Sequence, residues 1–157
     1  MKNKQLYDKT VGILVDAYFN DTLKHNYCTA CAAGNIVAAN MGFAFTGLAW
    51  RSENKTYEMP YWNHVFLTST FRQRRCPKWY VGEAKLQIDS TGYTWQELAK
   101  IEYAFETAQK GNSDDEWMFN GLMSVIDVLD IIHENTDTHV TTLYKSKFNK
   151  TCSLSFS

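Results

Sequence analysis

The sequence predicts a mainly α-helical protein: a compact helical bundle with an irregular middle region rich in aromatic residues and arginine. Three observations support this class. Two segments in the second half begin with capping motifs and continue as amphipathic stripes, a third stripe lies near the start, and 45% of the residues are hydrophobic, enough for a buried core. The 157 residues fit one domain, so we expect a single helical domain over 1–150 and a strand-like tail over 151–157.

Two helices are expected in the first quarter of the chain. The first covers about residues 4–23, where apolar residues recur on one helical face: Tyr7, Val11, Leu14, Tyr18 and, at its end, Thr22. The second covers residues 29–40 and consists mostly of small side chains, which let another backbone approach closely. We predict that it is short and buried, and that it ends at Asn40 and Gly42.

Residues 43–93 are the least regular part of the chain. They contain both prolines and all four arginines. Residues 61–71 and 79–81 favour strands by composition. Because a structureless loop of this length would be unusual, we expect short strands or helical turns within it.

The next two helices have the clearest start signals. Thr94 and Glu97 match a capping box, and an apolar stripe follows until Gly111. Ser113 and Glu116 match a second box, followed by a stripe that reaches Ile132. We expect these helices to form an αα-hairpin.

Gly121 lies inside the second of these helices, where it costs about 1 kcal/mol relative to alanine. Close approach of another backbone would explain a glycine there. We therefore expect Asn120-Gly121 to pack against Gly34-Asn35, with the two asparagine side chains hydrogen-bonded to each other.

The last seven residues alternate strictly between polar and apolar side chains. This is the pattern of a strand with one apolar face, formed by Cys152, Leu154 and Phe156. Such a strand needs a partner edge, from this chain or another. These three residues are therefore predicted interaction residues.

Charge is unevenly distributed along the chain. The net charge is -1, which gives no global field for nucleic acid or membrane. Residues 1–80 hold ten Lys/Arg and five Asp/Glu, whereas residues 81–157 hold six Lys and twelve Asp/Glu. The two halves either attract each other within one fold or offer a basic site to a partner. No targeting signal or membrane span is visible, so we expect a cytoplasmic protein with reduced cysteines.

His25, Cys28 and Cys31 follow one another at spacings of three and are the strongest candidate metal ligands. Two thiolates and an imidazole suit zinc, but a structural site needs a fourth ligand. The candidates for that ligand are Cys76, His64, His133 and His139. A redox alternative has Cys28 as a thiolate at the N-terminus of the 29–40 helix, with Cys31 as the resolving thiol. A third alternative is that both cysteines are buried packing residues.

A second group of titratable residues lies on the last two predicted helices. Asp130 and His133 are three residues apart, and Glu102 and Glu106 are four apart. Carboxylates and histidines on facing helices can bind two metals. The alternative is an ordinary solvated face.

The segment 72–80 combines positive charge with aromatic rings. Arg72, Arg74, Arg75, Lys78 and Trp79 are candidate interaction residues. These groups can contact phosphates and stack on bases, although no nucleic-acid module surrounds them. The alternatives are an exposed loop that pairs with the acidic half and a protein-binding segment, and we favour protein over nucleic acid as the external partner.

Two segments resemble a family of small uncharacterised proteins from Bacteroidetes and their phages. They are Cys28-Thr29-Ala30-Cys31-Ala32-Ala33-Gly34-Asn35 and the segment from Thr94 to Leu129 with its Phe119-Asn120-Gly121-Leu122 core. The resemblance implies a bacterial host cytoplasm or a phage virion and gives no mechanism. Some family members are labelled as a sodium-translocating quinone reductase subunit. This chain has neither the cysteines of a plant-type iron–sulfur cluster nor a flavin or nicotinamide fingerprint.

The functional expectation from sequence is a non-enzymatic structural or protein-interaction component of a larger assembly, such as a phage particle, with a protein partner or a second copy of itself. No catalytic set and no cofactor motif is recognisable. The first alternative is a small zinc-binding or thiol-redox protein centred on Cys28 and Cys31. The second is a nucleic-acid-binding accessory protein.

Overall fold

The computed structural model describes residues 1–25, 27, 30–46, 49–52, 55–57 and 85–137, and within them the protein is mainly helical, as predicted. The helices are α1 (Lys4–Phe19), α2 (Ala32–Met41), α5 (Trp95–Glu106) and α6 (Asp114–Ile132), and residues 85–90 form a further helical segment. The strands predicted over 61–71, 79–81 and 151–157 lie outside the described residues.

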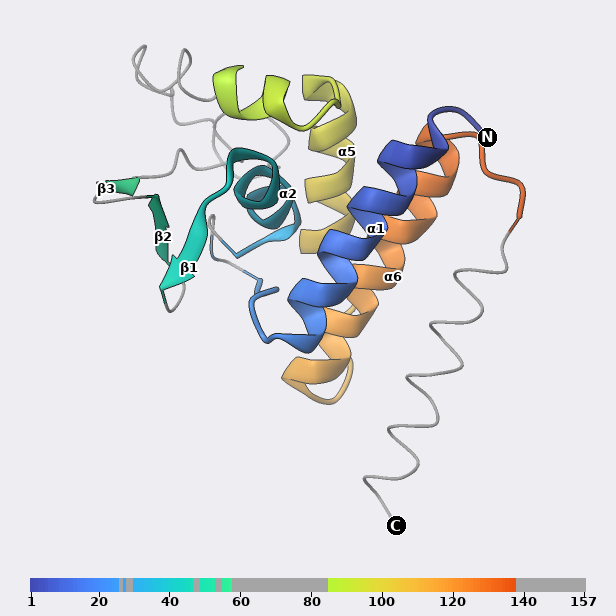
Figure 1. Cartoon of the computed structure of the whole chain (residues 1–157). Coiled ribbons are helices and arrows are strands. Elements are labelled where there is room, and N and C mark those ends of the chain that lie inside the picture. The colour runs from blue at the N-terminus through green and yellow to red at the C-terminus, as the bar shows by residue number, and fades with distance from the viewer. Residues whose placement is uncertain (26, 28–29, 47–48, 53–54, 58–84, 138–157) are drawn as a thin grey trace.

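The four longer helices form a closed ring around the core. α1 packs on α2 and α6, and α5 packs on the same two helices. Figure 1 shows α1 (blue) and α6 (orange) side by side, with α2 between this pair and the strands. The contact between α5 and α6 is the most extensive, which confirms the predicted αα-hairpin.

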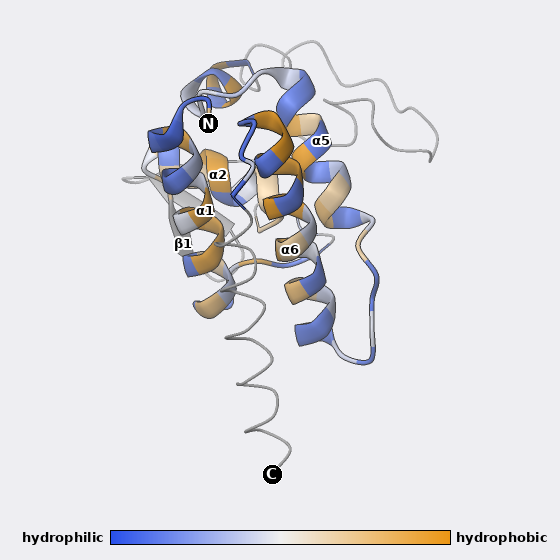
Figure 2. Ribbon diagram, turned by 90° about the vertical axis from the view of Figure 1, so that its right-hand side faces the viewer, coloured by the Kyte–Doolittle hydropathy of each residue, from blue (hydrophilic) through white to orange (hydrophobic). Residues whose placement is uncertain are grey.

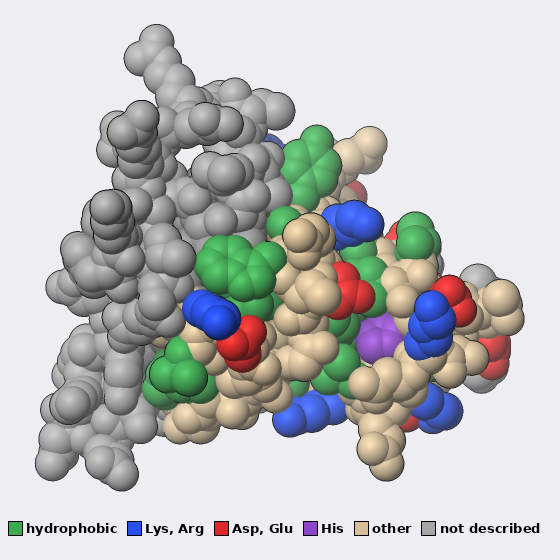
Figure 3. All heavy atoms as spheres, turned by 90° about the horizontal axis from the view of Figure 1, so that it is seen from above, with side chains coloured by type: hydrophobic (Ala, Val, Ile, Leu, Met, Phe, Trp, Pro, Cys, Tyr) green, Lys and Arg blue, Asp and Glu red, His purple; other side chains and the backbone are tan. Residues whose placement is uncertain are grey.

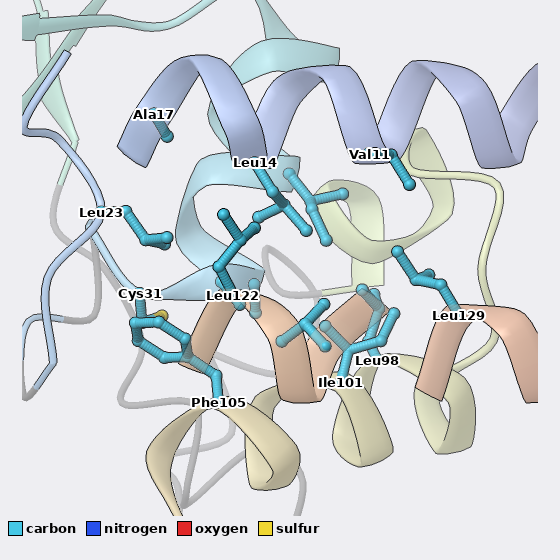
Figure 4. Close-up of a cluster of buried hydrophobic side chains, with 14 of the residues drawn as sticks. Val11, Leu14, Ala17, Leu23, Cys31, Leu98, Ile101, Phe105, Leu122 and Leu129 are labelled. Atoms are coloured by element: carbon cyan, nitrogen blue, oxygen red, sulfur yellow. The ribbon is translucent and has the colours of Figure 1, made fainter. Parts of the chain in front are cut away.

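The core is built mainly from the apolar stripes that the sequence predicts, and Leu23 and Ile88 add to it from outside those stripes. Its largest fully buried side chains come from the four longer helices, from the segment 85–90 and from the chain after α1: Tyr7, Leu14, Leu23, Ile36, Ile88, Leu98, Ile101, Phe105, Ile126 and Leu129. Figure 4 shows such side chains from α1, α5 and α6 converging, and Figure 2 shows hydrophobic and hydrophilic residues alternating along each helix. Each buried Leu, Ile or Phe contributes about 1.5–3 kcal/mol, so this core accounts for most of the stabilisation.

α1 ends earlier than the periodicity suggests. The helix stops at Phe19, because Asn20 leaves helical geometry and Asp21 has a left-handed backbone with φ of 62°. Asparagine and aspartate tolerate this region better than other non-glycine residues. The chain therefore turns at Asp21, and residues 22–25 leave the helix instead of continuing it to residue 23.

α2 begins later than predicted, at Ala32 instead of residue 29. Cys31 is its N-cap residue, and the Cys31 thiol accepts a hydrogen bond from the Gly34 N–H over 3.3 Å. The helix ends at Gly42, as predicted, where a φ of 73° suits glycine. The small side chains are buried, because α2 packs on both α1 and α5.

The two predicted capping boxes differ in the structure. At α5 both bonds of the box form: Thr94 Oγ1 accepts from the Glu97 N–H, and Glu97 accepts from the Thr94 N–H. At α6 the Ser113 hydroxyl accepts from the Glu116 N–H, but the Glu116 carboxylate accepts from the Asn112 N–H. In the second box, the hydrogen bond to the Glu116 carboxylate therefore comes from Asn112, the residue before the N-cap Ser113. α5 also ends at Glu106, before the predicted stop at Gly111.

A small antiparallel sheet follows α2. It contains β1 (Ala44–Thr46), β2 (Ala49–Ser52) and β3 (Lys55–Tyr57) in that order, with Phe45 opposite Trp50 and Trp50 opposite Tyr57. Within the described residues, no helix combines the length and apolar character needed to cross a bilayer.

Candidate functional site around His25

The loop between α1 and α2 positions His25 and Cys31. The Lys24 N–H donates to the Ala30 carbonyl, and the Cys31 N–H donates to the Tyr27 carbonyl, which folds the loop back on itself. The Asn35 side-chain amide then reaches back from α2 and donates to three carbonyls at 2.9–3.0 Å, those of Thr22, Ala30 and Cys31. One buried asparagine therefore fixes both ends of the loop.

The imidazole of His25 lies between two aromatic rings. Its centroid is 4.1 Å from Phe105 of α5 and 4.0 Å from Trp117 of α6, and the rings are nearly parallel. The side chain is 2% exposed. Each such stacked pair contributes about 0.5–1.5 kcal/mol beyond burial. The loop is thus held against both helices through one side chain.

The two ring nitrogens of His25 have different surroundings. Nε2 is 3.1 Å from the Trp117 carbonyl, and because a carbonyl only accepts, Nε2 has the proton. Nδ1 is buried, has no hydrogen-bond partner among the described residues, and lies 3.6 Å from Glu106 Oε2. The indole Nε1 of Trp117 is also buried without such a partner. Two unsatisfied polar atoms in adjacent rings are unusual in a folded protein.

Gly121 makes room for this stack. A Cβ atom at this position would lie 2.7 Å from the Phe105 ring and 3.2 Å from His25 Cε1. The prediction that another backbone comes close to this glycine is therefore wrong, because the nearest atoms belong to the side-chain rings of Phe105 and His25. The side-chain amide of Asn120 donates to the Gln109 carbonyl, and that of Asn35 donates to the loop carbonyls, so the two asparagines do not bond to each other.

Glu102 brings a carboxyl group into the core beside this loop. It is buried, and it accepts a hydrogen bond from the Ala33 N–H at the N-terminus of α2 over 3.0 Å. Burial, and then the charge of Glu106, raise the pKa of Glu102 to about 8, while hydrogen bonds from Ala33 and the Cys31 thiol act in the opposite direction. A protonated Glu102 is therefore favoured at neutral pH.

Cys31, Glu102, Glu106 and His25 form a continuous polar cluster, which we call the His25 cluster. Cys31 contacts Glu102, Glu102 contacts Glu106, and Glu106 faces His25. Glu106 is 28% exposed and is the member closest to solvent. The cluster thus runs from a buried thiol to a partly exposed carboxylate. The sequence predicts that Glu102 and Glu106 either bind metal together with Asp130 and His133 or belong to a solvated face. Both predictions are wrong for Glu102, which is buried and belongs to no metal-binding group of described residues.

The predicted metal triad is only partly assembled from described residues. His25 and Cys31 belong to one cluster, whereas Cys28 lies outside the described residues, as do Cys76, His64 and His139. Among the described residues, no three His, Cys, Asp or Glu side chains are arranged to hold a metal ion. The redox alternative is wrong in one respect, since Cys31 and not Cys28 is the residue at the N-terminus of α2.

The predicted interaction residues lie outside the part of the chain that the structure describes. This applies to the basic segment, with Arg72, Arg74, Arg75, Lys78 and Trp79, and to the tail, with Cys152, Leu154 and Phe156. What the described residues offer instead is an aromatic surface at the same end of the bundle as His25. Tyr18 and Phe19 at the end of α1 and Phe119 of α6 form it, and we call it the aromatic corner.

Comparison with known proteins adds no relative: the chain matches no protein-family model, no curated protein sequence and no solved structure. The resemblance to small Bacteroidetes and phage proteins therefore stays a prediction.

Proposed function

We propose that the protein is a non-enzymatic interaction component of a larger assembly, and that the aromatic corner is one of its contact surfaces. The observation that supports this most directly is the position of Phe19. Its side chain is among the most exposed large hydrophobic ones in the described chain, at 67%, at the end of a helix that otherwise buries its apolar face.

The surroundings of Phe19 also support a contact surface. Its ring meets the edge of Tyr18 at a centroid distance of 5.2 Å, and Tyr18 lies 6.2 Å from Phe119. Tyr18 and Phe119 are half-buried against the core, so Phe19 is the exposed member of a group of three neighbouring rings. Aromatic residues are enriched at protein interfaces and frequently dominate their binding energy.

Substitution of Phe19 tests the proposal. Phe19→Ser should weaken association of the full-length protein about tenfold or more, because burying a Phe side chain contributes about 1.5–3 kcal/mol and tenfold corresponds to 1.4 kcal/mol. Light scattering coupled to size exclusion, over a wide concentration range, measures association. Ile131→Ser is the matched control, since Ile131 is 76% exposed at the opposite end of α6.

The result that contradicts the proposal is equal association of the two variants with the parent protein, or a parent that stays monomeric throughout. Helix content and thermal midpoint should be unchanged in both variants, because neither residue belongs to the core. A loss of folding in Phe19→Ser would itself count against it, since the ring would then be structural.

The tail is the second proposed contact. Its alternating pattern suits addition to the edge of a partner's sheet. Deleting residues 151–157 should weaken association while the helical core stays folded. Unchanged association after this deletion would remove the tail from the proposal and leave the aromatic corner.

The His25 cluster favours a second candidate function, binding of a transition metal such as zinc. Nδ1 of His25 is unpartnered and 3.6 Å from Glu106 Oε2. Zinc ligands at about 2.0–2.2 Å in tetrahedral geometry lie roughly 3.3–3.5 Å from each other, which is close to this separation. These two residues would supply half of a site, and Cys28 is the predicted sulfur ligand.

Elemental analysis of untagged protein tests this candidate. One zinc per chain that is lost in His25→Gln would support it. Absence of metal after purification with added zinc, together with an unchanged thermal midpoint on zinc addition, would exclude it.

A further inference from the structure

The exposed ring of Phe19 lies next to an exposed carboxylate on the same helix. Asp16 precedes Phe19 by three residues in α1, and side chains at this spacing are neighbours on one face of a helix. Both residues are exposed, and among the described residues the Asp16 carboxylate forms no ion pair. The end of α1 therefore presents an apolar ring and a negative charge side by side.

The surroundings of this pair are also negative. The C-terminal end of a helix has a partial negative charge, which favours a cation there, but the last turn of α1 has no basic residue and contains Asp16 instead. Lys24 follows α1, but its ammonium group pairs with Asp21. The first turn of α6, which lies beside the end of α1 in Figure 1, adds three more carboxylates: Asp114, Asp115 and Glu116. A cationic group from a partner would therefore meet a negative surface at this end of the bundle.

An aromatic ring beside a carboxylate suits a guanidinium group. The face of the ring attracts a cation, and the carboxylate accepts charge-assisted hydrogen bonds from it. The planar guanidinium stacks on a ring and donates to a carboxylate in its own plane, whereas the ammonium group of lysine is a compact, strongly hydrated charge. The same negative surface repels phosphate groups, which disfavours nucleic acid and anionic lipid as partners.

We propose that the aromatic corner binds an arginine side chain from a basic segment of a partner protein, with the guanidinium group stacked on Phe19 and paired with Asp16. This inference rests on the proposed function and specifies the chemistry of the partner. Rising salt should weaken the contact, because exposed charge pairs are screened. A purely apolar contact would not weaken in this way.

Binding of a blocked tri-arginine peptide to the full-length protein, followed by NMR, tests the inference. The peptide should shift the ring signals of Phe19. Phe19→Leu keeps an apolar side chain but removes the ring, and it should weaken binding about two- to fivefold, because an exposed cation–π contact contributes about 0.5–1 kcal/mol. A tri-lysine peptide of the same charge should bind more weakly to the parent protein.

The carboxylate is tested in the same way. Asp16→Asn should weaken binding of the tri-arginine peptide about twofold or more and reduce its salt dependence. Asp8→Asn is the matched control, because Asp8 is an exposed carboxylate two turns earlier on α1 and is paired with Lys4. It removes the same charge from the protein and should leave binding unchanged.

Three results would overturn the inference. The first is equal affinity of Asp16→Asn and Asp8→Asn for the tri-arginine peptide. The second is equal affinity of Phe19→Leu and the parent protein. The third is equal binding of the tri-lysine peptide. The proposed function fails separately: loss of association in Phe19→Ser, with none in Phe19→Leu or Asp16→Asn, would keep the aromatic corner as a contact surface and reject arginine as its partner.

Discussion

Two buried histidines lie near opposite ends of the α1–α6 pair, and their surroundings differ in one respect. His133, at the end of α6, has a hydrogen-bond partner on each ring nitrogen: the Lys2 carbonyl at 2.7 Å and the Tyr93 hydroxyl at 2.8 Å. His25 has a partner on one nitrogen only. The first arrangement is complete as a structural network, whereas the second leaves a buried nitrogen facing a carboxylate.

The His133 network ties the N-terminus to the end of α6. The Lys2 N–H donates to the His133 carbonyl, so the two residues exchange bonds in both directions. Tyr93 also bonds to Thr10, and Tyr7 donates to Asp130 over 2.6 Å. Burial raises the pKa of Tyr93 to about 12 and that of Tyr7 further, so both hydroxyls stay protonated. Figure 3 views the molecule from above, and on this face acidic and basic side chains of the described residues are interspersed.

Complete hydrogen bonding of the buried nitrogens distinguishes the structural His133 network from the candidate site at His25. Buried polar groups that are fully paired specify packing, whereas an unpaired one costs about 1–3 kcal/mol and calls for another explanation. The predictions below test whether the His25 cluster behaves like the His133 network or differs from it.

The largest expected effect is loss of the ring below His25. Phe105→Ala should lower the free energy of unfolding by about 3–5 kcal/mol, because Phe105 is fully buried and its removal leaves a cavity. Urea denaturation measures the change. Tyr103→Ala, on the exposed side of α5, should change stability by less than about 0.5 kcal/mol. A small effect in Phe105→Ala would mean that the stack contributes little to the fold.

The next effect concerns how the free energy of unfolding depends on pH. The folded protein holds a proton on Glu102 over a range, from about 4.5 to about 8, in which the unfolded chain has lost it. The contribution of this group is therefore fully present at acidic pH and declines as pH rises through this range, by an amount on the order of a few kcal/mol. Glu102→Gln should flatten that part of the stability profile, because glutamine stays neutral and still accepts from Ala33.

The control for this measurement is Glu134→Gln, which changes an exposed carboxylate paired with Lys2. Its pH profile should match that of the parent protein. The contrary result is a free energy of unfolding that rises between pH 5 and 8 in the parent protein, with the same pH dependence in Glu102→Gln. It would show that Glu102 is ionised in the folded protein.

The parts of the fold that depend on residues close together in the sequence are the most predictable. The capping box of Thr94 and Glu97 and the stripe that follows involve neighbours three or four residues apart, so local rules identify them. The end of α1 depends on the left-handed Asp21, which periodicity does not reveal. The helical segment 85–90 lies in a region without helical periodicity and is likewise not predicted.

The candidate site is less predictable, because its partners are far apart in sequence. His25 and Cys31 are recognisable by spacing, but Trp117 is 92 residues from His25 and has no residue pattern that connects it to the loop. Gly121 is the one local signal of the site, since a glycine inside a strong helix indicates a close contact. Its partner, the Phe105 ring, follows only from the packing of α5 on α6.

Gly121 also gives a prediction of intermediate size. Gly121→Ala adds helix propensity worth about 1 kcal/mol but places a methyl 2.7 Å from the Phe105 ring, and overpacking of this kind costs about 1–3 kcal/mol. We expect a net loss on the order of 1 kcal/mol, together with a changed fluorescence of Trp117. Gly12→Ala in α1 is the control, because no described residue outside the backbone of α1 and the neighbours of Gly12 lies within 4 Å of the added Cβ, and it should stabilise the protein. Equal stabilisation by both changes would show that the stack has room to move.

An effect of similar size is expected in the His133 network. Tyr93→Phe removes one hydroxyl and with it the bonds to Thr10 and His133, at a cost of about 1–2 kcal/mol, since both partners are left buried.

The imidazole nitrogen signals of the two histidines then provide a direct comparison by NMR. In the parent protein His133 should have its proton on Nδ1, because the Lys2 carbonyl only accepts, and His25 should have its proton on Nε2 for the same reason at Trp117. Tyr93→Phe should shift the Nε2 signal of His133 and leave both His25 signals in place. A shift at His25 instead would mean that the two ends of the bundle are coupled, and the distinction between a complete network and an open one would no longer hold.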